Sequence, residues 1–332
     1  MKAIRCTKYG SPDVLRLEEV AKPTPKEDEV LIQVHAASIN ARDWRFMRAN
    51  PFFIRLGFGF LKPKRQILGT DLAGQVEAVG TKVKQFQPGD EVFGCLFGDD
   101  RSTFAEYVCA KENEIVLKPA NLSFEQAAAV PLAALTALQG LRDKGNIQPG
   151  QRVLIQGASG GVGTFAVQIV KAFGAEVTAV CSTRNLDMVR SLGADHVIDY
   201  TKEDFTRNGQ RYELILAVNG YHSISGYMRA LSLDGIYVVA GGSMLQLFQA
   251  ALQSRQNPKV NQKSYVTSLK PNQMDLFFIK GLLESGKIIP MIDGCYPLCK
   301  TAEAFRYFEQ THTRGKVVIN IEHDHATEGD GE

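Results

Sequence analysis

A glycine-rich turn at residues 157–163 carries the clearest chemical signal in this sequence. It reads Gly-Ala-Ser-Gly-Gly-Val-Gly, between an apolar run at 153–156 that predicts a strand and a segment at 162–173 that predicts a helix. Residues without a Cβ atom let the chain bend and let a pyrophosphate lie against amide groups at the helix start. A glycine triplet alone is weak evidence, but this strand–turn–helix context is typical of a dinucleotide site. The alternative is a glycine turn without a ligand.

The residues after the second strand indicate which dinucleotide to expect. This strand is predicted at 176–181, and Ser182, Thr183 and Arg184 follow it with no carboxylate among them. Enzymes that use NAD usually place an acidic residue there for the ribose 2′-hydroxyl. Two hydroxyls and a guanidinium suit a 2′-phosphate instead, because arginine offers a bidentate, charge-assisted contact. The sequence therefore predicts NADPH. The alternative is that Arg184 is a solvated charge at a helix start.

The order of predicted elements indicates an α/β protein with two sheets. Residues 1–122 read as short strands and turns, and Ser123 suits the start of a helix. Strands and helices then alternate as far as residue 265, which indicates a doubly wound parallel sheet of the Rossmann type. Residues 266–322 return to a mixed pattern and end in a strand at 316–321. We therefore expect a cofactor domain at 123–265 inserted into a discontinuous β-rich domain, followed by a disordered tail at 323–332.

Length and composition set the remaining limits. The chain has 332 residues and a formal net charge of +2, so no global field favours nucleic acid or an anionic membrane. No signal peptide and no apolar run long enough to span a membrane is visible, so a cytoplasmic protein is expected. The cysteines are scattered without a C-x-x-C pair, which fits a reducing compartment. Cys295 and Cys299 are read as isolated thiols.

Six motifs together resemble one protein family over nearly the whole chain. They are Gly-Ser-Pro-Asp-Val-Leu at 10–15, Ala-Ser-Ile-Asn-Ala-Arg-Asp at 37–43, Leu-Gly-Thr-Asp-Leu-Ala-Gly at 68–74, Gln-Pro-Gly-Asp-Glu-Val at 87–92, the glycine turn, and Arg-Gly-Lys-Val-Val at 314–318. The sequence is similar to the zinc-free, zeta-crystallin-like quinone oxidoreductase branch of the medium-chain dehydrogenase/reductase superfamily. The resemblance implies a GroES-like fold for the discontinuous β-rich catalytic domain.

Departures from the zinc-dependent relatives imply that the protein is metal-free. Those relatives bind zinc through a cysteine where this chain has Asn40, and through a Gly-His-Glu where it has Gly69-Thr70-Asp71. A structural zinc lobe needs four close cysteines near residues 90–115, where only Cys95 and Cys109 occur. The histidines show no ligand spacing.

The absence of zinc indicates the kind of reaction. Oxidising an alcohol needs a Lewis acid to stabilise an alkoxide, whereas a conjugated acceptor spreads the incoming charge over its own π-system. We therefore expect NADPH-dependent reduction of a small, apolar quinone or α,β-unsaturated carbonyl compound. The proton comes from water or a nearby hydroxyl. Several relatives carry a tyrosine shortly after the Asn40 position, but this chain has Trp44 and Phe46 there.

The resemblance also implies the site residues. Those that hold the pyrophosphate are Ser159, Gly160, Gly161 and Val162. Those expected at the 2′-phosphate and adenosine are Ser182, Arg184 and Tyr200, with Thr183 beside them. Those that line the rest of the groove are Asn219, Ala240, Gly241 and Gly242. Asn40 is the candidate catalytic residue, positioning the acceptor or the nicotinamide ribose; the alternative is an asparagine that only caps a turn.

Two further segments leave alternatives open. Residues 42–65 contain seven basic and six aromatic residues but one acidic residue. They are read as a packed loop, as a lid over an apolar pocket, or as a surface that contacts membrane or RNA. The last reading supports a second functional hypothesis, an NADPH-binding protein with a non-catalytic role, although nucleic acid is not an expected partner. Residues 263–269 read as an edge strand, and the resemblance implies a homodimer that pairs such edges of the cofactor-domain sheets.

Overall fold

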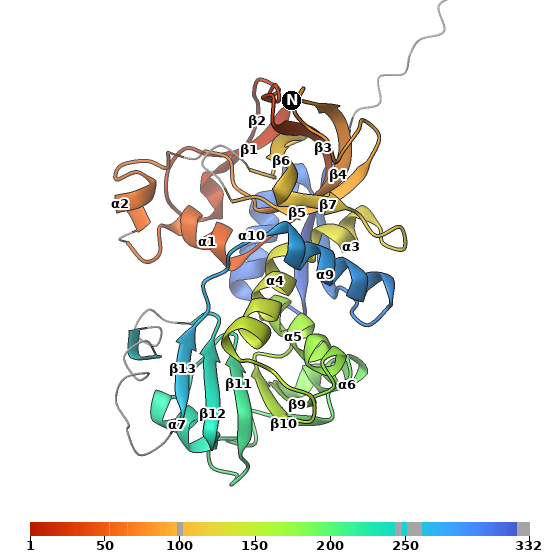
Figure 1. The fold of residues 1–332 in the computed structure, drawn as a ribbon. Helices are drawn as coiled ribbons and strands as arrows, with labels where there is room; N and C mark the ends of the chain where they lie inside the picture. The colour runs from red at the N-terminus through yellow and green to blue at the C-terminus, as the bar shows by residue number, and fades with distance from the viewer. Residues whose placement is uncertain (53, 65, 98–101, 243–247, 251–260, 324–332) are drawn as a thin grey trace, which may run out of the picture.

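The computed structural model of the protein describes residues 1–52, 54–64, 66–97, 102–242, 248–250 and 261–323. These residues form a six-stranded sheet, a seven-stranded sheet and a two-stranded ribbon. In Figure 1 the six-stranded sheet lies in the lower half of the molecule and the seven-stranded sheet in the upper half. The predicted α/β class with a Rossmann-type sheet and a separate β-rich sheet is confirmed. Of the predicted tail, only His323 belongs to the described residues.

The six-stranded sheet is parallel throughout, as the alternation of strands and helices predicts. Its strands in spatial order are β10 (His196–Asp199), β9 (Glu176–Cys181), β8 (Arg152–Gln156), β11 (Tyr212–Ala217), β12 (Leu231–Val239) and β13 (Lys263–Val266). The order reverses direction between β8 and β11, and open sheets of this kind bind ligands at such a switch point. Because β13 ends the described order, the predicted edge strand is confirmed over its first four residues.

The seven-stranded sheet combines strands from both ends of the chain. Its main path is β14 (Ile292–Pro297), β15 (Lys316–Asn320), β3 (Glu29–Ser38), β4 (Asp71–Val79), β5 (Glu91–Cys95) and β7 (Ile115–Leu117), with β6 (Tyr107–Lys111) paired to β3. The ribbon consists of β1 (Lys2–Cys6) and β2 (Leu15–Glu19). Strand β15 thus returns to the sheet that the first hundred residues begin.

Helices cover both sheets and connect them. Those that accompany the parallel sheet are α4 (Pro131–Gln139), a π-helix (Gly140–Lys144), α5 (Gly161–Ala172), a 3-10 turn (Thr183–Asn185), α6 (Leu186–Ser191) and α7 (Ile224–Ala230). The others are α1 (Ala41–Arg48), α2 (Ile54–Phe58), α3 (Phe124–Ala128), α9 (Gln273–Glu284), α10 (Thr301–Gln310), and 3-10 turns at Pro12–Val14, Glu112–Glu114 and Leu298–Lys300. None of the described helices is long and apolar enough to cross a membrane.

The helix predicted to begin at Ser123 is confirmed, but it is short. The Ser123 hydroxyl accepts a hydrogen bond from the Gln126 amide, and the Gln126 side chain accepts one from the Ser123 amide. A second helix, α4, begins at Pro131, because proline is suited to the first turn of a helix but interrupts its interior. Helix α3 packs on β3 and β4, whereas α4 packs on α5.

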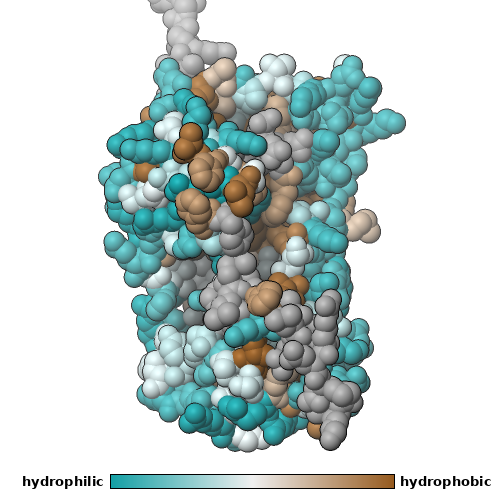
Figure 2. All heavy atoms as spheres, turned by 90° about the vertical axis from the view of Figure 1, so that its left-hand side faces the viewer, coloured by the Kyte–Doolittle hydropathy of each residue, from teal (hydrophilic) through white to brown (hydrophobic). Residues whose placement is uncertain are grey.

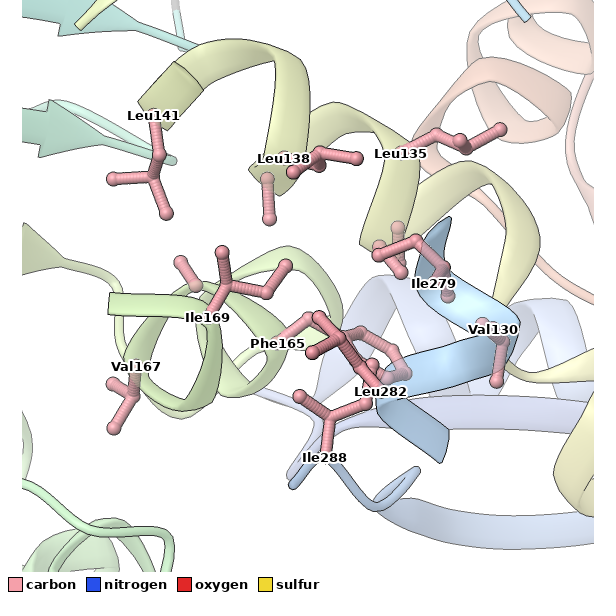
Figure 3. Packing of buried hydrophobic residues seen from close by; sticks show 14 of the residues in the cluster. Val130, Leu135, Leu138, Leu141, Phe165, Val167, Ile169, Ile279, Leu282 and Ile288 are labelled. Carbon is pink, nitrogen blue, oxygen red and sulfur yellow. The ribbon is translucent and has the colours of Figure 1, made fainter. Parts of the chain in front are cut away.

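One apolar cluster joins the two halves of the molecule. Figure 3 shows side chains of α4, α5 and α9 meeting there, with Leu135 and Leu138 on α4, Phe165 and Ile169 on α5, and Ile279 on α9. All five are buried, each with no exposed surface. This shared core holds the glycine turn at the start of α5 at a defined position relative to the seven-stranded sheet.

Candidate active site

The glycine turn connects β8 to α5 in the geometry that the sequence predicts. Gly157 has a φ of +77°, which favours glycine, and Gly160 precedes the first turn of α5. A Cβ atom at Gly163 would lie 2.0 Å from the Gly157 carbonyl oxygen, so only glycine lets the helix start this close to the turn. A Cβ atom at Gly160 would lie 3.7 Å from the same oxygen, an ordinary contact, so this position leaves room beside the amide groups at the start of α5, as an anion site requires.

Two adjoining cavities form a trough along the carboxyl ends of the parallel strands. One has a volume of about 560 Å³ and the other about 830 Å³. Both are lined by Val218, Asn219, Phe308, Glu309 and Thr313, so the trough is continuous. We call the smaller cavity the adenosine end and the larger one the acceptor end.

The structure brings most of the expected residues to this trough. Those that line the adenosine end are Ser159, Gly160, Ser182, Tyr200 and Asn219. Those that line the acceptor end are Asn40, Gly161, Val162, Asn219, Ala240, Gly241 and Gly242. Thr183 and Arg184 do not line either cavity.

The side chains of Thr183 and Arg184 are engaged beside the adenosine end. The Thr183 hydroxyl donates to the Asp199 carboxylate, which, together with Thr201, lowers the pKa of Asp199 to about 2. Arg184 donates through Nη2 to the carbonyl oxygen of His312, a residue that lines this cavity. The guanidinium therefore lies at the rim of the adenosine end, whereas Thr183 binds an acid that had not been expected there.

Asn185 lines the adenosine end and is a residue that the sequence analysis missed. Its Nδ2 donates to the hydroxyl oxygens of Ser159 and Ser182 at 3.0 and 3.2 Å, and thus links the glycine turn to the end of β9. Its Oδ1 is buried and has no hydrogen-bond partner. A buried acceptor without a partner is costly. A ligand that donates a hydrogen bond there would satisfy it.

Tyr200 pairs with a second tyrosine at the same cavity. Its ring centroid lies 5.7 Å from that of Tyr221, and both rings line the adenosine end and are partly exposed. Such a pair offers aromatic surface for a planar base. The sequence did not single out Tyr221, because a lone tyrosine after a strand carries no periodic signal.

Asn40 lies at the acceptor end within a buried polar cluster. Its backbone precedes α1, where the Asp43 carboxylate accepts a hydrogen bond from the Asn40 amide at 2.9 Å. Its Nδ2 donates to Asp71 Oδ2 at 2.9 Å, and its Oδ1 accepts from Lys316 Nζ. The Lys316 ammonium also lies 3.3 Å from Asp71 Oδ2. Asn40 is therefore more than a helix cap, and its side-chain amide is occupied by the protein itself.

Three arginines of α1 also line the acceptor end. Arg48 forms a two-pronged ion pair with Glu309 at 2.6 and 2.7 Å, and Arg45 donates to the carbonyl oxygen of Gly242. The guanidinium of Arg42 stacks on the ring of Phe97, 4.0 Å from its centroid. Its Nη1 is buried with no hydrogen-bond partner, and burial lowers its pKa.

The basic and aromatic segment at 42–65 divides into two parts. Its first part is α1, which forms a wall of the acceptor end. Its second part contains α2 and leaves Phe52, Leu56, Phe60 and Leu61 exposed, from 59% to 86%. Figure 2 shows brown, apolar side chains on the face of the molecule that carries this part. Residues 53 and 65 lie outside the described residues.

Within the described ranges, no three His, Cys, Asp or Glu side chains are grouped so that they could hold a metal ion. Thr70, at the position where zinc-dependent relatives have a histidine, donates instead to Asp43 at 3.1 Å. Cys95 is fully buried, and burial raises the pKa of its thiol.

Comparisons with known proteins agree with this geometry. The family model of an alcohol dehydrogenase GroES-like domain matches residues 26–120, and that of a zinc-binding dehydrogenase matches residues 192–319. The 2-methylene-furan-3-one reductase of Solanum lycopersicum is 38% identical over 96% of this chain and 79% of its own length. The NADPH-dependent alkenal/one oxidoreductase of Arabidopsis thaliana chloroplasts is 35% identical over the same shares. The solved quinone oxidoreductase of Coxiella burnetii superposes with a TM-score of 0.87 and 30% identity, over 97% of this chain and 99% of that one.

Proposed function

This chain belongs to the zinc-free quinone oxidoreductase branch of the medium-chain dehydrogenase/reductase superfamily, and we propose that it uses NADPH to reduce small quinones or α,β-unsaturated carbonyl compounds. It is an oxidoreductase with a nicotinamide cofactor. The observation that carries the proposal is the continuous trough, with a glycine turn on one wall and the Asn40–Lys316 cluster at its acceptor end.

The residues present fit a dinucleotide. Gly160 leaves room for a pyrophosphate at the start of α5, and the partnerless Asn185 Oδ1 can accept a hydrogen bond from the bound molecule. When bound, the nicotinamide supplies a hydride. The chain's own part is to hold the cofactor along the trough and to place an acceptor against it, which is a problem of positioning and exclusion of water.

The choice of NADPH rests on Ser182 and Arg184. Ser182 lines the adenosine end, and Arg184 lies at its rim with no ion pair to a carboxylate among the described residues. We assign these two residues to the 2′-phosphate. Thr183 has a different role in this proposal, because its hydroxyl keeps the Asp199 carboxylate in a hydrogen bond beside the site.

A conjugated acceptor fits the chemistry of the acceptor end. Asn40 and Thr70 stand where zinc-dependent relatives have metal ligands, and both side chains are used in hydrogen bonds within the protein. Reduction of a quinone or an enone needs less help than formation of an alkoxide, because the acceptor delocalises the added charge. The tomato relative is named a 2-methylene-furan-3-one reductase and the Arabidopsis relative an NADPH-dependent alkenal/one oxidoreductase, which supports this class of acceptor.

The test is cofactor oxidation followed by the absorbance of the reduced nicotinamide. NADPH and NADH are compared side by side, each with 9,10-phenanthrenequinone and with a short 2-alkenal, before and after dialysis against a chelator. We expect turnover with NADPH, weak turnover with NADH, and no loss after dialysis. Turnover that favours NADH would refute the assignment of Ser182 and Arg184. Loss of turnover on dialysis with recovery on adding zinc would refute metal independence. Tight NADPH binding without turnover of either acceptor would favour the non-catalytic alternative.

A further inference from the structure

Lys316 is a buried cation at the junction of the two sheets. It begins β15, and its side chain is only 4% exposed while lining the acceptor end. The preceding Gly315 donates its amide to the Ser159 carbonyl oxygen at 3.0 Å, so the start of β15 is bonded to the glycine turn. A Cβ atom at Gly161 would lie 2.9 Å from Lys316 Cδ. The lysine stem therefore runs along the glycine turn toward the seven-stranded sheet.

The ammonium has more donors than the protein uses. An ammonium carries three N–H groups. One donates to Asn40 Oδ1 and one to Asp71 Oδ2, whose other oxygen accepts from the amide of Leu132 at 2.9 Å. The third N–H of Lys316 has no protein partner within the described residues. Because the residue lines the acceptor end, this N–H is available to a molecule bound there.

Asn40 and Asp71 hold the ammonium in place and offer little else to a ligand. The side-chain Nδ2 of Asn40 donates to both Asp71 and the carbonyl oxygen of Ser38, while the side-chain Oδ1 accepts from Lys316. The Asp71 side chain is fully buried and also accepts from the Ser38 hydroxyl. These two residues are positioning residues for Lys316.

The other cations at the acceptor end are arranged differently. Arg48 is paired with the Glu309 carboxylate, and Arg45 donates to the backbone carbonyl oxygen of Gly242. Arg42 stacks on the ring of Phe97. Lys316 is the cation that contacts both the glycine turn and the Asn40–Asp71 pair among the described residues.

We propose that Lys316 is a catalytic residue that donates a hydrogen bond to the carbonyl oxygen of the acceptor. This rests on the reductase function proposed above. A hydride adds an electron pair to the acceptor, and the negative charge gathers on that oxygen. A fixed ammonium stabilises charge that develops there at no cost of reorganisation. A proton from water then completes the reduction, so the lysine remains an ammonium throughout.

The test compares wild type with Lys316→Met, with Lys118→Met as the matched control. Lys118 is buried to the same degree, at 5% exposure, and its ion pair with Glu91 spans 3.1 Å, but it lies outside the trough. For Lys316→Met we expect kcat to fall by about 10²-fold or more, as for removal of one preorganised donor. The dissociation constant for NADPH, measured by fluorescence titration, should stay within a few-fold. Lys118→Met should keep wild-type kcat.

Two further variants keep the test decisive if Lys316→Met does not fold. Lys316→Met with Asp71→Asn removes both charges of the buried pair and should fold with the same loss of kcat. Lys316→Ala opens a space for a small amine, and ethylammonium should restore part of its kcat in a concentration-dependent way. Rescue by sodium ions to the same extent would contradict a hydrogen-bond donor.

The outcomes separate this inference from the function it rests on. If wild type does not turn over any quinone or enone, the proposed function fails. If wild type turns over and the neutral variants keep its kcat, only the role of Lys316 fails. If those variants keep kcat but bind NADPH much more weakly, Lys316 is a cofactor ligand, and the inference is overturned.

Discussion

Two alanine substitutions in the glycine turn should separate folding from cofactor binding. A Cβ atom at Gly163 would lie 2.0 Å from the Gly157 oxygen, where ordinary contact begins at 3.4 Å, and the clashing atom is backbone. Overpacking of this kind costs about 1–3 kcal/mol, so we expect Gly163→Ala to lower the melting temperature by roughly 2–12 °C. At Gly160 a Cβ atom would lie 3.7 Å from the same oxygen, in a backbone conformation with φ −86° that alanine adopts freely.

Gly160→Ala should therefore fold like wild type, within about 0.5 kcal/mol. Its methyl group enters the space in which the pyrophosphate meets the amides of α5. Loss of one charge-assisted hydrogen bond costs about 1.5–3 kcal/mol, which corresponds to a dissociation constant for NADPH about 10- to 100-fold higher. Thermal melts and calorimetric titration measure the two effects. Wild-type affinity in Gly160→Ala would refute the placement of the pyrophosphate, and wild-type stability in Gly163→Ala would refute the packing argument.

Substitutions at three more positions test other parts of the structure. Arg184→Gln should raise KM for NADPH about tenfold or more and leave KM for NADH unchanged, because NADH has no 2′-phosphate to lose a partner and the lost hydrogen bond to the His312 carbonyl oxygen is common to both cofactors. Steady-state kinetics would contradict this if both values rose equally. Burial raises the pKa of Asp43 to about 6, so folding favours its protonated form, and the stability it contributes is lost as pH rises from about 4 to 6. Asp43→Asn should therefore gain stability relative to wild type as pH rises through that window, by about 1.4 kcal/mol for each pH unit. Denaturant unfolding at several pH values measures this, and a difference in unfolding free energy between variant and wild type that does not change with pH would contradict it. Phe165→Ala should lower the free energy of unfolding by about 3–5 kcal/mol, and Phe165→Leu by clearly less, because the ring is fully buried in the core formed by α4, α5 and α9. Equal losses for the two variants in urea unfolding would contradict the packing argument.

Local pattern was sufficient for the parallel sheet. The strand at 176–181 lies where the sequence predicts it, and the predicted strand at 153–156 extends by one residue as β8. Both are buried on two faces, so they read as continuous apolar runs that end at turn residues. The helices α9 and α10 were not predicted, because after residue 266 short apolar runs alternate with turn residues, and such runs are equally typical of helices and of strands.

The site could be predicted in part. The glycine turn was found because its residues are consecutive and its function depends on backbone. Asn185 was missed although it follows Arg184 directly, since only its position against the Ser159 hydroxyl makes it part of the site. Thr183 was expected as a phosphate neighbour, but its hydroxyl binds Asp199 from the next strand, which no spacing in the sequence indicates.

The sequence by itself determined the features that short-range physics controls: the period of strands and helices, the cap at Ser123, and a turn that only glycine can form at residue 163. The tertiary structure alone decided which polar side chains share the acceptor end. Lys316 and Asn40 are 276 positions apart, and they meet because β15 returns to pair with β3. A buried ammonium needs partners of opposite charge or dipole, and the fold supplies them from two segments far away in the sequence, at Asn40 and Asp71.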